Sequence, residues 1–171
     1  MDYKNILEHL LVQFPKTIDH HLETELFKTK TPFDPLSIGM IQNKIFFNLA
    51  LFSQNNNKKY FFEIKDCLET LMRHYEITKS IGAQYSIKYK IICKCYDIKE
   101  YIKLAINFLN AYSILNDIRY FNTALKVTDY IISEVVVNDK KDSADDNLLP
   151  FMIIILKNIC CSLDLLHKRH S

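Results

Sequence analysis

Glycine is scarce in this sequence: the 171 residues contain only Gly39 and Gly82. Tight β-hairpin turns and the loops that cradle phosphate groups both depend on glycine, because its backbone adopts conformations that other residues avoid. The P-loop, the dinucleotide fingerprint and the nucleophile elbow are therefore all excluded. Tryptophan is absent and only four prolines occur, whereas 11 Phe and 10 Tyr supply large apolar side chains.

The sequence also lacks an excess of one charge and a long apolar run. Its net charge is +2, with the two signs mixed along the chain, so nucleic acid is not expected as a partner. The longest uninterrupted apolar stretch is Leu148 to Leu156. A bilayer span needs about 20 such residues, so we predict a core segment there and no membrane partner.

The cysteines do not form a disulfide pattern. Five are present, an odd number, and two pairs have the close spacings Cys93-x-Cys95 and Cys160-Cys161. Asp2, Lys4 and Glu8 interrupt the first residues, so we expect no signal peptide. Together these features predict reduced thiols and a cytoplasmic protein.

Helical spacing of apolar residues dominates the chain. It predicts helices over residues 3–14, 18–28, 35–53, 58–79, 83–95, 98–115, 118–135 and 148–167. We therefore predict an all-α fold of seven to eight helices in antiparallel hairpins, either α-solenoid-like or a compact bundle. The chain is predicted to be a single domain, 1–171, with a break at 29–35 and a mobile charged loop at 138–147.

Local signals place the ends and the core of these helices. Asp34-Pro35 favours a helix start, Gly82 favours a helix end, and Asp97 with Glu100 resembles a capping box. The segments 131–137 and 151–155 have β-branched residues but are predicted to be helical, with no sheet in the molecule. The residues expected to be almost fully buried are Phe46, Ile64, Leu68, Leu71, Leu109 and Phe121.

The hairpin predicted over residues 98–135 resembles helical hairpins of the tetratricopeptide kind. The resemblance rests on the turn Leu115-Asn116-Asp117 and on Ala124-Leu125 in the helix that follows. It covers this hairpin only, and the glycine and proline positions of that repeat are absent. It implies stacked hairpins only, and it assigns no functional residue.

The densest titratable cluster is Asp19 to Glu25, which contains His20, His21 and Glu25. His21 and Glu25 are four residues apart, so they share a helix face and would form a minimal acid/base pair. The same arrangement is also an ordinary solvated helix face. An enzyme that uses this pair remains one hypothesis for the function.

Two further clusters contain residue types that occur in binding sites. Cys93, Cys95, Cys160 and Cys161 with His167 and His170 contain metal-ligand residue types, but C-x-C on a helix points its thiols apart, so we predict no metal and no cofactor. A second cluster interleaves aromatic residues with lysines, a composition that suits single-stranded nucleic acid. It comprises Tyr85, Lys88, Tyr89, Lys90, Lys94, Tyr96, Lys99 and Lys103. Lysine stems lying over a core stripe are the preferred interpretation.

The preferred function is a helical adaptor or scaffold that binds another protein or itself, without catalytic activity. The predicted helix 98–115 has two apolar faces, so one of them is available for a neighbouring hairpin or a partner. Tyr112, Tyr120 and Tyr130 are the predicted partner-binding residues, because tyrosine is enriched at interfaces. An accessory subunit of a biosynthetic enzyme with a small-molecule pocket is the alternative.

Overall fold

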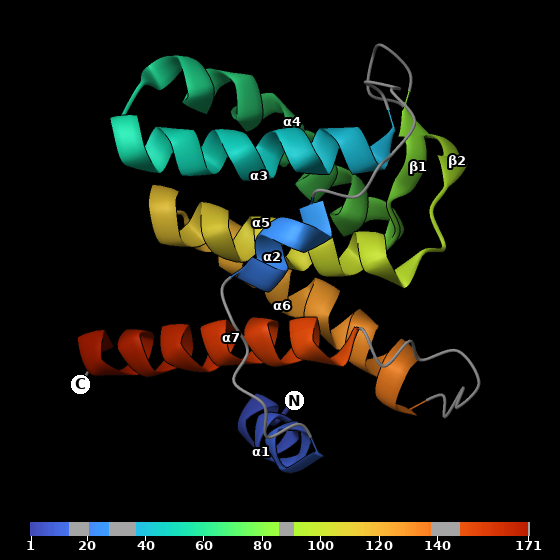
Figure 1. Cartoon of the computed structure of the whole chain (residues 1–171), viewed down its shortest axis with the longest axis vertical. Coiled ribbons are helices and arrows are strands. Elements are labelled where there is room, and N and C mark those ends of the chain that lie inside the picture. Colours follow the sequence, from blue (N-terminus) through green and yellow to red (C-terminus); the bar gives the residue numbers. More distant parts are fainter. Residues whose placement is uncertain (14–20, 28–36, 86–90, 138–147, 171) are drawn as a thin grey trace.

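The computed structural model describes residues 1–13, 21–27, 37–85, 91–137 and 148–170 (Figure 1). Within these residues the chain forms seven α-helices and one two-stranded sheet. In chain order they are α1 (Tyr3–Gln13), α2 (His21–Phe27), α3 (Ile38–Asn55), α4 (Lys58–Thr78), β1 (Gly82–Tyr85), β2 (Ile91–Lys94), α5 (Ile98–Leu115), α6 (Ile118–Ile132) and α7 (Leu149–His170). A π-helical turn, Ser133–Val137, continues α6. The predicted all-α fold class is confirmed.

The two segments with β-branched residues are helical, as predicted. Residues 131–137 complete α6 and its π-helical turn, and residues 151–155 lie in the first half of α7. Ile153 and Ile155 are fully buried there, so tertiary packing outweighs their strand propensity. The predicted break at 29–35 and the predicted charged loop at 138–147 lie outside the described residues.

The predicted helix over 83–95 is wrong, because this region contains the antiparallel pair β1–β2. Gly82 begins β1, and the preceding helix instead ends at Lys79, which adopts the left-handed conformation. The Tyr85 side chain is fully buried and stacks on His74 of α4, with ring centroids 5.6 Å apart. The Cys95 N–H donates to the Ile81 carbonyl at 2.8 Å, which fixes the open end of the hairpin. We therefore attribute the strand conformation of this segment to the packing of Tyr85 on α4.

Two helical hairpins, α3–α4 and α5–α6, have the same construction. The first helix of each ends at an asparagine in the left-handed conformation, Asn56 or Asn116, whose N–H donates to a carbonyl at 2.8 Å. The next residue, Asn57 or Asp117, caps the second helix by accepting a backbone N–H at 3.0 Å. Asparagine tolerates the left-handed region and its neighbour is a good N-cap, so each pair makes a tight turn without glycine.

Aromatic contacts repeat between the two hairpins in the same way. Phe52 packs on Phe61 in the first hairpin at 5.7 Å, and Tyr112 packs on Phe121 in the second at 5.0 Å, both with tilted rings. Each second helix also carries the pair Tyr-Phe in its first turn, Tyr60-Phe61 or Tyr120-Phe121. The hairpins are therefore structural equivalents, with matching positions in their turns and ring contacts.

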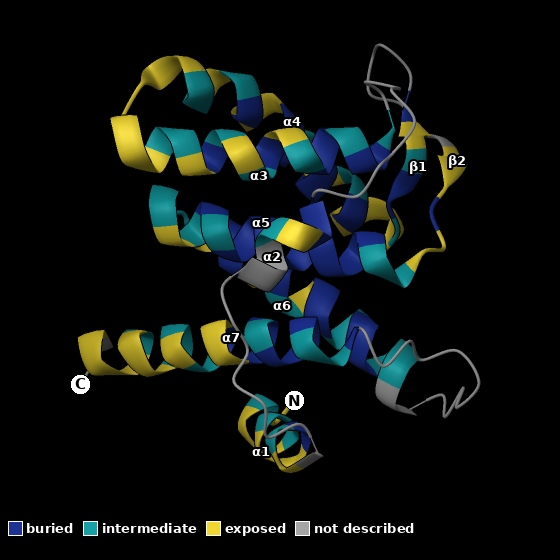
Figure 2. Ribbon diagram, in the orientation of Figure 1, coloured by how far each residue is buried: buried dark blue, intermediate teal, exposed yellow. Residues whose placement is uncertain are grey.

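The hairpins stack through their first helices. In Figure 1, α3, α5 and α7 lie one below the other and run in the same direction, and the β-hairpin closes the opposite end from the two turns. Helix α5 contacts α3 on one side, α7 on the other and α6 behind, while α1 packs on α7. Residues 100–109 of α5 are consequently buried on every face (Figure 2). The two apolar faces predicted for this helix are both covered within the fold.

Five of the six predicted core residues are almost fully buried: Ile64, Leu68, Leu71, Leu109 and Phe121. The prediction for Phe46 is wrong, because its side chain is only partly buried. Its ring stacks on Phe27 of α2 with centroids 4.1 Å apart. Helix α3 therefore has an outer face that α2 covers only in part.

Helix α7 is long and apolar enough to cross a membrane, judged by length and composition over Leu149–Arg169. The uninterrupted run noted in the sequence is shorter, but the helix continues past Lys157 and Asn158. A third of the apolar window is buried in this fold, 33%, and these residues lie mainly in the half that follows Leu149. The other half is largely exposed (Figure 2).

Candidate functional site

A groove of about 560 Å³ lies between the α3–α4 turn and the α5–α6 turn. We call it the turn groove. Its lining residues come from both hairpins: Phe52, Asn56, Lys58, Phe61, Phe62, Lys65, Glu69, Ile114, Leu115, Asp117, Arg119 and Tyr120. Because both turns are tight and lie at the same end of the stack, the first turns of α4 and α6 form two walls of one groove.

One wall is a row of aromatic rings. The ring of Phe61 lies 5.7 Å from that of Phe52 and 5.6 Å from that of Phe62. The Asn57 cap fixes the start of α4, so Lys58, Phe61, Phe62, Lys65 and Glu69 recur at helical spacing along the face that lines the groove. Phe62 is 64% exposed and adjoins Phe61, so it extends the aromatic row to the surface.

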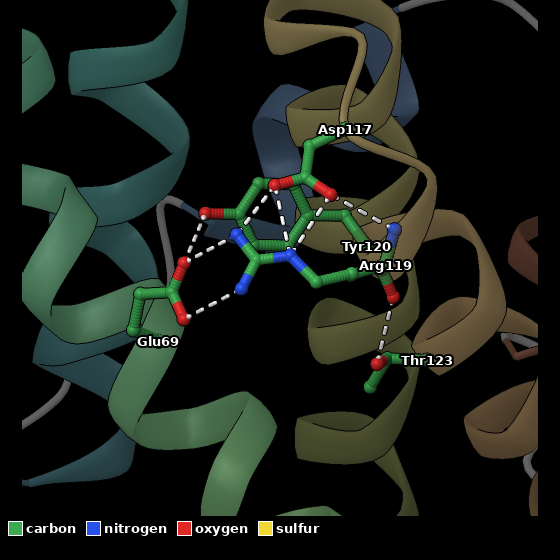
Figure 3. A network of polar contacts seen from close by, with 5 residues as sticks. All are labelled: Glu69, Asp117, Arg119, Tyr120 and Thr123. Carbon is green, nitrogen blue, oxygen red and sulfur yellow. Dashed lines mark hydrogen bonds and ion pairs between the residues drawn. The ribbon is translucent and has the colours of Figure 1, made fainter.

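A polar network lines the opposite wall and links it to Glu69 of α4 (Figure 3). Arg119 pairs with Asp117 at 2.6 Å and with Glu69 at 3.0 Å, which joins α6 to α4. The Tyr120 hydroxyl donates to the same Glu69 carboxylate at 3.3 Å, and the Thr123 hydroxyl donates to the Arg119 carbonyl at 3.0 Å. Arg119 therefore forms ion pairs with both acidic residues that line the groove.

The network fixes the charge states of this wall. Hydrogen bonding from Arg119 lowers the pKa of Asp117, and hydrogen bonding to Asp117 raises the pKa of Arg119. Burial, followed by the charge of Glu69, raises the pKa of Tyr120. At neutral pH the Asp117 carboxylate and the Arg119 guanidinium are therefore charged and the Tyr120 hydroxyl is neutral, and the ion pair between Arg119 and Glu69 holds the two hairpins in register.

Two exposed lysines complete the rim. Lys58 begins α4, and the Lys65 ammonium lies 5.7 Å from the centroid of the Phe61 ring. Neither lysine has an ion pair among the described residues. The groove therefore combines a wall of aromatic rings, a polar network in which Arg119 pairs with two carboxylates, and two exposed lysines without an ion pair among the described residues.

The three tyrosines predicted to bind a partner lie in different places. Tyr120 lines the turn groove, but its side chain is 2% exposed and only its hydroxyl edge takes part in the polar network. Tyr112 is partly buried and lines a smaller groove of about 160 Å³ between α5 and α7. Tyr130 packs its ring 4.7 Å from that of Tyr101. The sequence had no signal that singled out Phe62, since its exposure depends on where the hairpins meet.

The histidine and carboxylate candidates are only partly described. His20 lies outside the described residues, and His21 begins α2 without a described side chain. Glu25 is exposed on α2. The acid/base hypothesis for these residues stays a prediction.

The thiols are spread over the molecule. All five cysteines are free; Cys67 and Cys95 are buried, whereas Cys93 and Cys161 are exposed. Cys93 lies in β2, so the helical geometry assumed for Cys93-x-Cys95 does not apply. Among the residues that the structure describes, no three His, Cys, Asp or Glu side chains gather as a metal-binding group.

A buried polar network joins α3 to α5. Lys103 is 1% exposed and its ammonium donates to the Glu100 carboxylate at 3.0 Å. The Gln42 side-chain amide donates to the same carboxylate at 3.0 Å, and the Asn107 amide donates to the Gln42 carbonyl at 3.1 Å. Lys103 therefore does not belong to an exposed aromatic and lysine surface, and Tyr85 is buried as well.

Comparison of the chain with protein-family models, with curated proteins and with solved structures finds no match.

Proposed function

We propose that the protein is a helical interaction module that binds a segment of another protein in the turn groove. The observation that carries the proposal is Phe62. At the equivalent position of the second hairpin the chain has Asn122, which is exposed. Since a hairpin of the same construction forms with a polar residue at this position, the exposed aromatic ring of Phe62 is not required by the fold.

The surroundings of Phe62 support the same proposal. The rings of Phe52 and Phe61 extend the apolar surface inward, and Ile114 and Leu115 close it on the α5 side. Contiguous exposed apolar surface rimmed by charged residues commonly marks a protein interaction site. Aromatic residues that fill a groove also dominate binding energies at such sites.

A small-molecule pocket is the second candidate, because a volume of about 560 Å³ falls within the usual range for such ligands. Ligand pockets, however, enclose most of their ligand's surface. Here Phe62, Lys58 and Arg119 are all exposed at the rim. An open groove of this kind fits a protein segment better than an enclosed compound.

The proposal is tested by selecting from a displayed library of random peptides on the purified full-length protein. We expect enriched peptides whose binding falls at least about tenfold when the protein carries Phe62→Ala, as for an aromatic hot spot. The matched control is Ile77→Ala, which removes an apolar side chain that is 74% exposed on the same helix, outside the groove. Enriched peptides that bind both variants as tightly as the unmodified protein would refute the proposal.

A further inference from the structure

The charge distribution around the turn groove identifies the chemistry of the segment that fits it. The lining contains three cations and two carboxylates. Arg119 pairs with both carboxylates, Glu69 and Asp117, so these three groups form one unit with a formal charge of −1. The other two cations, Lys58 and Lys65, are exposed, lie about two turns apart on α4 and make the formal charge of the whole lining positive, +1.

The conformation of the occupant follows from the walls. Both walls are helices, whose backbone groups are bonded within the helix. They offer no row of free N–H and C=O groups, so the groove has no strand edge for an extended peptide to join. The strands β1 and β2 lie at the other end of the stack (Figure 1). The recognition mode that suits this surface is a helix whose apolar side chains pack against the aromatic wall.

We propose that the turn groove binds an acidic amphipathic helix of a partner protein. Its bulky apolar side chains pack on Phe52, Phe61 and Phe62, and its flanking carboxylates pair with Lys58 and Lys65. This inference rests on the proposed function and adds the chemical class of the partner. A second copy of this chain is a poorer occupant, because the chain's own net charge is positive.

The test uses two synthetic peptides of about 16 residues, enough for roughly four helical turns. Both carry leucine at helical spacing and one tryptophan; one has glutamate at the flanking positions and the other has lysine. The protein contains no tryptophan, so fluorescence excited selectively in that residue reports the peptide alone. We expect the acidic peptide to bind at least about tenfold more tightly than the basic one, and the difference to shrink at high salt.

Substitutions in the protein test whether Lys58 and Lys65 cause the preference for the acidic peptide. The double variant Lys58→Glu, Lys65→Glu is expected to abolish or reverse the preference for the acidic peptide. Lys157→Glu, which reverses an exposed lysine on α7, is the matched control and is expected to keep the preference. Because all of these lysines are exposed, the variants are expected to fold normally.

The possible failures are distinguishable. If peptides bind in a Phe62-dependent way but the acidic and basic peptides bind equally, the proposed function stands and this inference is overturned. If the peptides selected from the library bind in a Phe62-dependent way but are basic or uncharged, the inference is also overturned. If single-stranded oligonucleotide binds and is lost in Phe62→Ala while neither peptide binds, both the inference and the proposed function are wrong.

Discussion

Among single residues, the buried pair Lys103–Glu100 is one whose disruption is expected to lower the stability strongly. The two side chains are 1% and 11% exposed, the Gln42 amide donates to the Glu100 carboxylate, and the Asn107 amide donates to the Gln42 backbone carbonyl. A buried ion pair contributes little net stability compared with apolar residues of the same size, but removing one partner leaves an uncompensated charge. We therefore expect the pair to limit the ways in which α3 and α5 can pack, and to add little to the free energy of unfolding.

Lys103→Ala is accordingly expected to lower the free energy of unfolding by about 3–5 kcal/mol. The double variant Glu100→Gln, Lys103→Met, which removes both charges and preserves volume, is expected to lose clearly less. Urea unfolding followed by circular dichroism measures both values. A double variant at least as unstable as Lys103→Ala would show that the charges themselves are stabilising.

Buried tyrosines provide a second residue-scale prediction, on pH. Burial raises the pKa of Tyr85 and of Tyr101 to about 12 from an ordinary value of 10.0, and it raises the pKa of Tyr75 in the same direction. Between these values the unfolded chain releases protons that the folded chain retains. Stability is therefore unaffected by these groups below about pH 10 and falls as the pH rises from about 10 to about 12.

The tyrosinate absorbance near 295 nm measures this directly. We expect the titration of the folded protein to extend to clearly higher pH than the titration of the protein in urea, where all tyrosines are solvated. Coincident titration curves would mean that these hydroxyl groups reach solvent in the folded protein.

At the scale of elements, the two Asn-initiated turns explain how a chain with two glycines makes tight helical hairpins. The turn at Asn116-Asp117 was predicted from the sequence, as were the helices on either side of it, because caps and apolar spacing are local signals. The equivalence with Asn56-Asn57 was not foreseen, since few side chains between the caps are shared. The backbone conformation at Asn56 and Asn116 reveals it.

Replacing the left-handed asparagines tests this account. Asn116→Ala is expected to lower the free energy of unfolding by about 1 kcal/mol, because a Cβ without a compensating polar group is unfavourable in the left-handed region. Asn116→Gly is expected to be neutral or slightly stabilising. The same pair of substitutions at Asn56 should give the same order. Equal losses for alanine and glycine would show that the asparagine side chain itself stabilises the turn.

The element that was predicted wrongly shows where local signals fail. Residues 83–95 have apolar residues compatible with a helix, yet Tyr85 packs beneath His74 and the chain pairs as β1–β2. This outcome depends on a surface of α4 that is distant in the sequence. The turn groove could not be predicted for the same reason: Phe62 and Arg119 meet only when the hairpins stack, and neither has a distinctive neighbour in the chain.

At the scale of the whole molecule, the parallel arrangement of α3, α5 and α7 places both turns at one end and the β-hairpin at the other (Figure 1). The Glu69–Arg119–Asp117 network joins the two hairpins at the end where the groove lies. The groove walls are thus held together before any ligand arrives, which reduces the entropic cost of binding. We therefore expect partner binding at this end of the stack.

Amide hydrogen exchange, measured with and without a selected peptide, shows where the peptide binds. Peptide binding is predicted to protect the first turns of α4, near Phe61 and Phe62, and the turn at Asn116-Asp117, while β1, β2 and the exposed half of α7 exchange as before. Protection confined to α7 or to the β-hairpin, with the turn groove unchanged, would contradict the account.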